Sequence, residues 1–540
     1  MAHEIGNYPN TNFSVFPMSP AREVELKLEV PADSLHRLAR SSLLQVARKK
    51  PSKPTTLVSV YFDTDKLKLR NKGLSLRVRR IGGRHVQTIK QETGESAVLF
   101  ARHEWEHQIG GSQPELDAAK DGALKPVFSK SVRRGLKPIF ETRVRRTVYP
   151  IRSGDSEIEL TVEKGKVEAG RQSSPLCEVE LELKRGESAE LFKLARTLAE
   201  EVPVQLAVQS KAERGYALVA GEAPEAVKAA PVALAPDYSR QAAFQAVART
   251  CLRHLVVNQT ATLRGDPEGV HQMRVALRRM RAAISLFADM LHDPQTEAMK
   301  EQFKWITREL GPARELDVFI SRVVKPLAHG RRNGAGVAVL VKDVQQRREE
   351  AFARACAAVE SPRFRSLVLD TAYWVEAGDW TRNPDDLTRL LREQAIVGAA
   401  ADELRRRWKK ILKAGARLGQ LDPERRHKMR LQAKKLRYAS EFFAGVFQGK
   451  KAARRREAFV AGLEKLQDAL GDLNDIAVHA GLTERIMHAQ DARGKQRPVR
   501  AKKAFAAGRL SGREEARIAY VLKDAQRAYR AFTKAKPFWS

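Results

Sequence analysis

The sequence has few cysteines, few aromatic residues and no long apolar run. Its three cysteines, Cys177, Cys251 and Cys356, are scattered and odd in number, so they form neither a disulfide framework nor a zinc-binding spacing. No apolar run approaches the ~18 residues that a transmembrane helix needs. The N-terminus lacks the basic and apolar regions of a secretion signal. These absences predict a cytoplasmic protein.

Acidic residues are also in the minority. The 540 residues include 98 Lys and Arg against 65 Asp and Glu, a net charge of +33. Residues 1–220 carry +9 of this charge and residues 221–540 carry +24. Such a surface attracts nucleic acid, anionic membrane or polyphosphate. Aromatic residues make up only 6%, and single-strand binders usually stack bases on aromatic rings, so nucleic acid is not expected as the specific ligand.

Two segments of the chain, 266–287 and 422–443, are copies of one predicted helix. Nine of their 22 aligned positions are identical, and both begin Asp-Pro-Glu, which is typical of a helix start. Met273, Leu277, Met280, Ile284 and Phe287 repeat at helical spacing and predict the core-facing side of the first copy.

A stripe of basic residues follows a different face of each copy. The spacing of 3, 4 and 3 places each stripe along about 15 Å of one helix face, without acids after the first turn. A solvated face would normally mix in acids, so we expect these stripes to bind an extended polyanion. The stripe residues are His271, Arg274, Arg278 and Arg281 in the first copy, and His427, Arg430, Lys434 and Arg437 in the second.

A second repeat supports an internal duplication. Each basic segment is followed by a Leu-Gly pair and acidic residues, at 310–317 and again at 470–475, which we interpret as a helix end and an acidic turn. The helical period after residue 237 therefore predicts an all-α domain of two duplicated four-helix halves. The stretch 493–504 is interpreted as a basic loop. The predicted divisions are a disordered tail (1–21), an N-terminal domain (22–220), a linker (221–237) and the helical domain (238–540).

The N-terminal part alternates charged and apolar residues on five predicted strands, near 23–30, 76–79, 102–106, 157–163 and 178–184. In a half-exposed sheet the charged face would be solvated. Charge on so many strands favours a closed antiparallel β-tunnel with a charged interior, within an α+β domain. Carboxylates inside it would hold Mg²⁺ or Mn²⁺, and Lys and Arg would hold phosphate oxygens.

The ordered motifs of the N-terminal part resemble those of the CYTH, or triphosphate tunnel metalloenzyme, family. Glu23-Val24-Glu25-Leu26-Lys27 is similar to the ExExK signature of that family. The set continues through Arg77, Arg79 and Lys90 to the Glu178-x-Glu180-x-Glu182 strand and the Ser210–Tyr216 segment. The C-terminal part resembles a CHAD domain, a helical module associated with polyphosphate, on the evidence of His271, His427 and their basic helices.

The resemblance implies hydrolysis of inorganic triphosphate in the tunnel, with polyphosphate bound by the CHAD part. The implied location is the cytoplasm, in association with polyphosphate granules. Of the run Arg143–Arg146 we prefer Arg146 as the inward arginine. The implied phosphate-binding and catalytic residues are Lys27, Arg77, Arg79, Lys90, Arg146, Lys211 and Arg214. The implied ligands of Mg²⁺ or Mn²⁺ are Glu23, Glu25, Glu104, Glu106, Glu163, Glu178, Glu180 and Glu182.

Other functions remain compatible with the sequence. A CYTH tunnel can also cyclise ATP, or act on thiamine triphosphate or an RNA 5′ end, and the phosphate-binding residues would be shared. A non-catalytic scaffold that binds polyanions is the alternative outside enzymes. Fusion to a polyphosphate-like module favours inorganic triphosphate.

Overall fold

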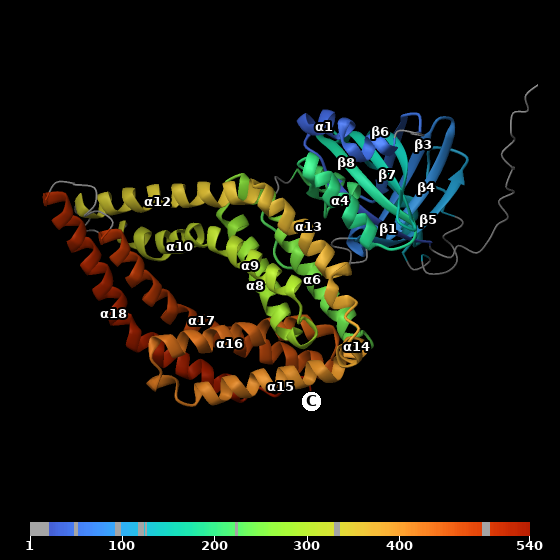
Figure 1. The fold of residues 1–540 in the computed structure, drawn as a ribbon. Helices are drawn as coiled ribbons and strands as arrows, with labels where there is room; N and C mark the ends of the chain where they lie inside the picture. Colours follow the sequence, from blue (N-terminus) through green and yellow to red (C-terminus); the bar gives the residue numbers. More distant parts are fainter. Residues whose placement is uncertain are drawn as a thin grey trace, which may run out of the picture.

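The computed structural model shows a sheet domain packed beside a larger helical region (Figure 1). It describes residues 21–47, 52–91, 99–116, 124, 127–221, 225–328, 335–488 and 497–539. The predicted tail, 1–21, lies outside this part of the chain except for its last residue. None of the described helices is long and apolar enough to cross a membrane.

The N-terminal part is a nine-stranded antiparallel sheet in the order β5-β4-β3-β2-β6-β7-β8-β1-β9. All five strands predicted from charge alternation are present. The strands are β1 (Ala21–Glu29), β2 (Thr55–Asp63), β3 (Leu74–Ile81), β4 (Arg84–Gln91), β5 (Leu99–Ile109), β6 (Lys137–Ser153), β7 (Ser156–Ala169), β8 (Gln172–Arg185) and β9 (Gln205–Leu206).

Strand β1 joins distant parts of this sheet. It pairs with β8 over Glu25–Glu29 and with β5 over Ala21–Leu26, so the sheet curls strongly. Leu26 and Leu28 on one face of β1 are fully buried against α4, while Glu25 and Lys27 on the other face are also buried. Because both faces are covered, the charged side is an interior surface, as the alternation predicted, and not a solvated one.

Short helices cover the apolar side of the sheet, and the rest of the chain is almost entirely helical. The helices are α1 (Leu35–Arg40), α2 (Ser42–Ala47), α3 (Lys130–Gly135), α4 (Ala189–Glu201), α5 (Lys211–Ala220), α6 (Arg240–Val257), α7 (Gln259–Leu263), α8 (Pro267–Leu286), α9 (Pro294–Glu309), α10 (Gly311–Phe319), α11 (Lys325–Ala328), α12 (Ala335–Glu360), α13 (Pro362–Ala377), α14 (Asp386–Glu393), α15 (Ile396–Gly415), α16 (Pro423–Phe442), α17 (Lys450–His488) and α18 (Arg497–Thr533).

The two predicted copies are helices α8 and α16, with the predicted starts. Asp266 caps α8 and Asp422 caps α16, each through a side-chain oxygen that accepts a backbone N–H, and a proline follows each cap. The predicted core residues of α8 are all buried. The neighbouring helices also recur in order: α6, α8, α9–α10 and α12 correspond to α15, α16, α17 and α18.

Two sequence-based expectations about helix ends are wrong. The first Leu-Gly pair does end a helix, because Pro312 follows and α10 starts anew at Gly311. The second pair has no proline after it, so α17 continues through Gly471. The basic loop expected at 493–504 is helical from Arg497 onward, as the start of α18, and residues 493–496 lie outside the described part of the chain.

The segment predicted as a linker packs on the helical region. Val232 and Leu234 are buried, although residues 225–234 have no regular secondary structure. Asn258, which follows the last residue of α6, accepts a hydrogen bond from the Val227 N–H and donates one to the Val227 carbonyl. His254 also contacts that carbonyl. His254 and Asn258 therefore hold residues 225–234 against the helical region. Neither side chain belongs to the basic stripes.

Gly215 of α5 offers a direct test of the packing beside the charged interior. A Cβ at this position would lie 2.0 Å from the ring of Phe140, so Gly215→Ala should cost roughly 1–3 kcal/mol of stability. We expect a lower thermal unfolding midpoint for the full chain. Gly398→Ala in α15, where no atom lies within 4 Å of the added methyl, is the control and should not lower the midpoint. Equal midpoints for the two variants would contradict this packing.

Candidate functional site

Three buried carboxylates meet on two neighbouring strands. Glu163 of β7 lies opposite Glu178 of β8 in the strand register, and Glu180 is two residues further along β8, on the same face. Their relative exposures are 0%, 1% and 6%, and one oxygen from each lies within 4.8 Å of the others. Buried carboxylates repel one another, so this group requires compensating cations or a metal ion.

The ammonium of Lys211 supplies part of that compensation. It lies 2.8 Å from Glu163, 3.0 Å from Glu178 and 2.6 Å from Glu180. Burial opposes ionisation, but the three carboxylates together raise the pKa of Lys211 well above its usual range. Despite its own burial, Glu180 has a pKa well below its usual range because Lys211, Lys27 and Arg146 surround it. Glu180 and Lys211 therefore form an ion pair at neutral pH.

Two further cations approach the carboxylates from β1 and β6. Lys27 pairs with Glu180 and lies 2.9 Å from Glu25. Arg146 donates from Nε to Glu163 at 2.7 Å and from Nη2 to Glu180 at 3.0 Å. Arg143 and Arg145 are exposed, so Arg146 is the arginine of this run that reaches the interior.

Helix α5 brings Lys211 and Arg214 to the cluster from its first turn. Ser210 caps the helix by accepting from the Glu213 N–H at 3.1 Å, and the Glu213 carboxylate accepts from the Ser210 N–H at 2.7 Å. Arg214 pairs with Glu29 of β1 and lies 3.4 Å from Glu178. Glu29 was absent from the predicted site, although it continues the charged alternation of β1.

A more cationic region follows on β3 and β4. Arg77 lies 3.7 Å from Glu104 of β5, and Lys90 lies 2.8 Å from the same carboxylate. Arg79 donates from Nε to Ser59 Oγ at 3.1 Å. Burial and the positive charges of Arg77 and Arg146 lower the pKa of Arg79 to about 10. An anion placed here would relieve that repulsion.

The remaining predicted acids lie outside the three-carboxylate group. Among the described residues, Glu163, Glu178 and Glu180 form the one group of acids close enough to share an ion. Glu106 is exposed and accepts from the Thr88 hydroxyl, and Glu182 is half-buried beside Lys184. Glu182 faces the same way as Glu180, but lies further along the strand. The side chain of Glu23 lies outside the described part of the structure.

Several buried polar atoms of the site lack hydrogen bonds. They include both carboxylate oxygens of Glu178, Oε2 of Glu163, and Nε of Arg77 and Arg214. These oxygens of Glu163 and Glu178 lie in ion pairs with Lys211 and Arg214, so these carboxylates are compensated by charge and not by hydrogen bonds. Oxygen donors of this kind suit Mg²⁺ or Mn²⁺, and an ion here would compete with Lys211 for the same carboxylates.

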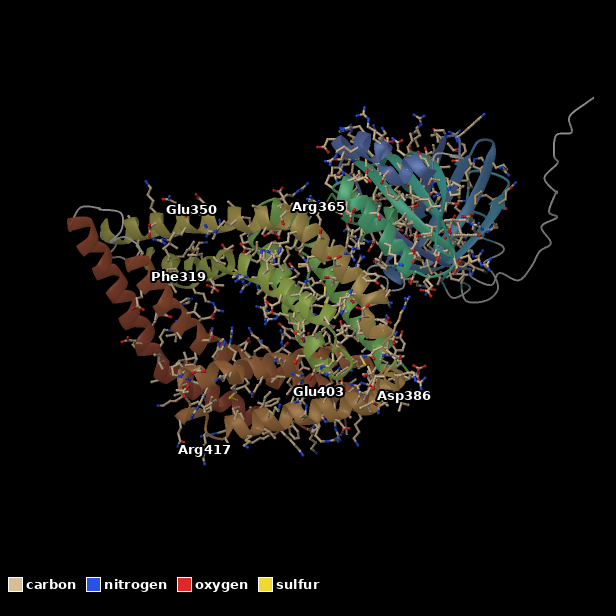
Figure 2. All side chains as sticks on the ribbon, in the orientation of Figure 1. Phe319, Glu350, Arg365, Asp386, Glu403 and Arg417 are labelled. Atoms are coloured by element: carbon tan, nitrogen blue, oxygen red, sulfur yellow. The ribbon has the colours of Figure 1, made fainter. Side chains whose placement is uncertain are left out.

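The basic stripes of the helical region also meet. Helices α8 and α16 are in contact, and Figure 2 shows nitrogen-bearing side chains along the side of α16 that faces α10. Burial together with the charges of Arg430 and Arg278 lowers the pKa of Lys434 to about 7. Burial and Arg278 lower the pKa of Arg274 to about 10. Residues from both copies therefore share one under-compensated cationic surface.

The glycines of the second repeat lie beside equivalent arginines of this surface. A Cβ on Gly311 would lie 3.0 Å from Nη1 of Arg274, which is a tight contact, whereas a Cβ on Gly471 would lie 3.8 Å from Nε of Arg430, which is an ordinary one. Gly311 therefore leaves room for its arginine, while Gly471 is not required on steric grounds. The Nε atoms of Arg274, Arg278 and Arg430 are buried without hydrogen-bond partners. Buried donors are usually satisfied, so these three could donate to an anion.

Some stripe residues are not partly buried cations without partners. Arg437 contacts Glu441, Gln467 and Glu464, and Arg281 is exposed. His427 is exposed and contacts Asn474 of α17, whereas His271 is half-buried. Burial and the charge of Arg314 lower the pKa of His271 to about 4, so it is neutral at pH 7 before any ligand binds.

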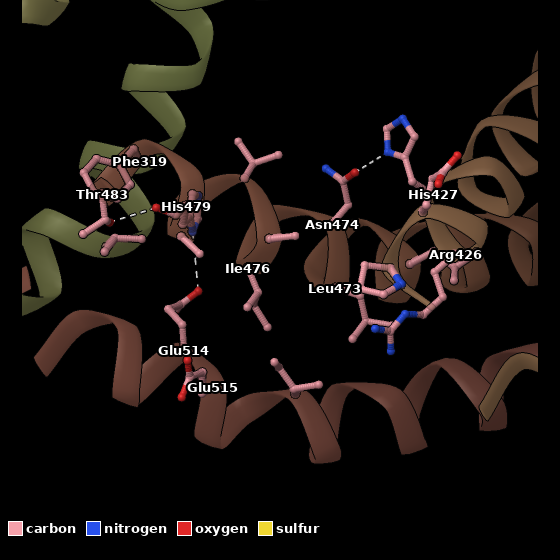
Figure 3. A pocket seen from close by; sticks show the side chains of 18 residues that line it. Phe319, Arg426, His427, Leu473, Asn474, Ile476, His479, Thr483, Glu514 and Glu515 are labelled. Carbon is pink, nitrogen blue, oxygen red and sulfur yellow. Dashed lines mark hydrogen bonds and ion pairs between the residues drawn. The ribbon is translucent and has the colours of Figure 1, made fainter. Parts of the chain in front are cut away.

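His427 lies on the rim of a separate cavity of about 530 Å³ (Figure 3). This cavity is lined mainly by apolar side chains of α17 and α18, with the buried pair His479 and Glu514 at one end. Its basic residues, Arg426 and His427, are matched by acids, and the other stripe residues do not line it. It is therefore unsuited to a polyanion.

Arg314 and Ser59 were not among the residues predicted for the two sites. Arg314 of α10 lies close enough to His271 for its charge to lower the pKa of that histidine, and Ser59 of β2 orients Arg79. Arg314 stands beside the Leu-Gly repeat, so the repeat itself was the available signal. Ser59 gives no signal, because a serine in a strand has many uses.

A curled antiparallel sheet with buried charged residues, followed by a helical region that contains an internal repeat, defines a protein of two domains. Family models match the chain in the same order, with the CYTH domain over residues 21–216 and the CHAD domain over residues 246–484. The chain therefore contains a CYTH domain followed by a CHAD domain.

A curated relative is also similar to this chain. The inorganic triphosphatase of Haemophilus influenzae is 29% identical over 212 residues, which are 36% of this chain and 55% of the relative. The chain thus matches about half the length of that protein.

Solved structures of both kinds resemble parts of the chain. The CHAD domain from the plant Ricinus communis is 27% identical, with a TM-score of 0.49 over 57% of this chain and 97% of the other. A putative adenylyl cyclase from Hippeastrum, described as having a dominant triphosphatase activity, is 20% identical, with a TM-score of 0.26 over 37% of this chain and 97% of the other.

Glu178 offers a test of metal binding that needs no substrate. Glu178→Gln removes a buried carboxylate from the three-acid group, so we expect Mn²⁺ affinity to fall about tenfold or more. Binding can be followed by the electron paramagnetic resonance signal of free Mn²⁺. Glu168→Gln, at a half-buried residue of β7 that pairs with Lys166, is the matched control and should bind like the wild type. Unchanged affinity in Glu178→Gln would place the metal elsewhere.

Proposed function

We propose that the sheet domain encloses a tunnel in which inorganic triphosphate is hydrolysed with Mg²⁺ or Mn²⁺, and that the helical domain binds polyphosphate. The observation that carries the catalytic part is the buried group of Glu163, Glu178 and Glu180, facing a set of lysines and arginines across the curled sheet. Acids for a metal and cations for phosphate oxygens stand side by side there.

The cations divide into two sets along the interior. Arg77, Arg79 and Lys90 bind the oxygens of one end of the triphosphate, where acids are few. Lys27, Arg146, Lys211 and Arg214 border the carboxylates and neutralise the oxygens at the other end. Holding the chain extended between the two sets aligns its phosphoanhydride bond for attack by water.

A divalent ion on the three carboxylates would supply further neutralisation of charge on the departing phosphate. The protein side of the reaction is positional and electrostatic. Glu163, Glu178 and Glu180 would hold the ion, and the ammonium of Lys211 would then be available to bind a phosphate oxygen. Glu25, beside Lys27, is positioned at the edge of the group to accept a hydrogen bond from the attacking water.

Phosphate release tests this assignment. With Mg²⁺ or Mn²⁺, the wild type should hydrolyse tripolyphosphate, whereas Lys27→Ala should lose about 100-fold or more of kcat/KM because a buried cation is removed from the phosphate site. The substrate panel should include ATP, thiamine triphosphate and a triphosphate-ended RNA, with cyclic AMP measured as well.

The matched control for this assay is Lys193→Ala, an exposed lysine of α4 that pairs with Glu190. It should retain full activity. Faster turnover of ATP to cyclic AMP than of tripolyphosphate to phosphate would overturn the proposed substrate. Full activity of Lys27→Ala would overturn the proposed site.

The helical domain has the features of a polyanion site without those of a hydrolase. The guanidinium groups of Arg274, Arg278 and Arg430 converge with Lys434 on a surface where buried Nε atoms lack partners. A phosphate chain would satisfy these donors and reduce the mutual repulsion of the cations. We therefore assign this surface to polyphosphate.

Lys434 makes this binding depend on pH. Its pKa of about 7 means that a large share of the free protein carries a neutral lysine at pH 7 and above. A bound polyanion favours the charged form and raises the pKa, so binding takes up a proton. Affinity for long-chain polyphosphate should therefore fall as pH rises from 7 to 9, by at most about tenfold per pH unit.

Calorimetry in buffers of different ionisation enthalpy measures this proton uptake. Lys434→Arg keeps the charge at all of these pH values, so it should flatten the pH dependence while it retains binding. A wild-type affinity independent of pH over this range would contradict the assignment of Lys434. Arg437→Lys serves as a comparison, because Arg437 is already paired with Glu441.

A further inference from the structure

The first helix of the CHAD domain contacts the part of the CYTH domain that carries two of its phosphate-site cations. Arg253 of α6 donates one hydrogen bond to the carbonyl of Val208, and its guanidinium also pairs with the carboxylate of Glu213 in α5. Arg253 and Glu213 are both about one-third exposed or less, so the contact is partly shielded from water. The pair bridges residues 40 positions apart, across the two domains.

The carboxylate of Glu213 also stabilises the start of α5. One of its carboxylate oxygens accepts the Ser210 N–H at 2.7 Å, while Arg253 binds the other oxygen. The Ser210 hydroxyl in turn accepts the Glu213 N–H. Arg253 therefore supports the capping box of α5 from a neighbouring helix. Its hydrogen bond to the Val208 carbonyl also fixes the segment that leads into the cap.

The residues on that same first turn are Lys211 and Arg214. Lys211 reaches all three buried carboxylates, and Arg214 reaches Glu29 and Glu178. Their positions depend on how α5 begins, since a shift of the first turn moves both side chains relative to the strands. Errors of about 1 Å in such a site can cost about 100-fold in rate.

We propose that Arg253 is a positioning residue of the triphosphate site: a CHAD-domain arginine that fixes the N-terminus of α5 and thereby places Lys211 and Arg214. The proposal rests on the proposed function of the CYTH domain. It makes the CHAD domain a structural part of the catalytic site, in addition to its own role in polyphosphate binding.

The test uses the full chain and compares Arg253→Ala with Arg253→Lys. Arg253→Ala should lower kcat/KM for tripolyphosphate about tenfold, and Arg253→Lys should recover part of this loss because an ammonium keeps one of the two contacts. Hydrogen exchange at the backbone amide of Glu213 should become faster in Arg253→Ala without any ligand. The control is Arg382→Ala, which removes another pairing between the domains, with Glu187, away from α5.

A double-mutant cycle with Glu213→Gln separates positioning from general destabilisation. If Arg253 acts through Glu213, the loss caused by Arg253→Ala should be several-fold smaller in the Glu213→Gln background. Equal losses in both backgrounds, or an effect of Arg382→Ala as large as that of Arg253→Ala, would overturn the proposal.

Failure of the positioning role of Arg253 is distinguishable from failure of the proposed function. If the wild type does not hydrolyse tripolyphosphate, the proposed function is wrong, and the same comparison is made on the calorimetric affinity for tripolyphosphate and on the Glu213 exchange rate. Arg253→Ala with wild-type affinity and wild-type exchange at Glu213 would then refute the positioning role on its own.

Discussion

The contact between one ammonium group and three buried carboxylates is the interaction on which the CYTH domain depends. Glu163, Glu178 and Glu180 cannot remain ionised together in a shielded interior unless Lys211 or another cation stands among them. The sheet supplies the acids from two adjacent strands, but the lysine comes from a helix more than 30 residues later in the chain. Correct assembly of the interior therefore requires α5 to be docked, and the domain cannot form its charged core from the sheet alone.

The CHAD domain presents the opposite electrostatic problem. Burial, together with neighbouring cations, lowers the pKa values of Arg274 and Lys434. Folding brings these groups together only because apolar residues on the other face of α8 are buried, so hydrophobic burial offsets the repulsion. Gly311 leaves room for the guanidinium of Arg274, since a Cβ there would lie 3.0 Å from its Nη1. A surface that folds at this electrostatic cost is stabilised by an anion, since binding removes the repulsion that folding creates.

The sequence predicted the local features well, because they follow from short-range chemistry. The caps at Asp266 and Asp422, the core face of α8 and the charged strands are set by propensity and periodicity. The resemblance to the CYTH family also identified most of the lysines and arginines in the interior of the sheet domain. What could not be predicted depends on tertiary position. Glu180 and Glu182 share a strand face, yet only Glu180 meets the other acids. Arg437 is paired by α17, and Arg253 gains its role from the neighbouring domain.

The arrangement of acids also separates the two candidate sites in chemistry. Among the acids near the CHAD stripes, Asp472 and Asp475 pair with Arg322, and Asp317 pairs with Arg348. In the described part of the chain, the three-carboxylate group of the sheet is the one place where acids gather closely enough for a metal. Under the proposed function, a phosphate chain on the CHAD surface would meet guanidinium groups but no ion to neutralise a departing phosphate, so it would be bound and not cleaved. The proposed difference between binding and hydrolysis thus follows from where carboxylates gather in a buried group, although both proposed sites would use lysines and arginines to hold phosphate.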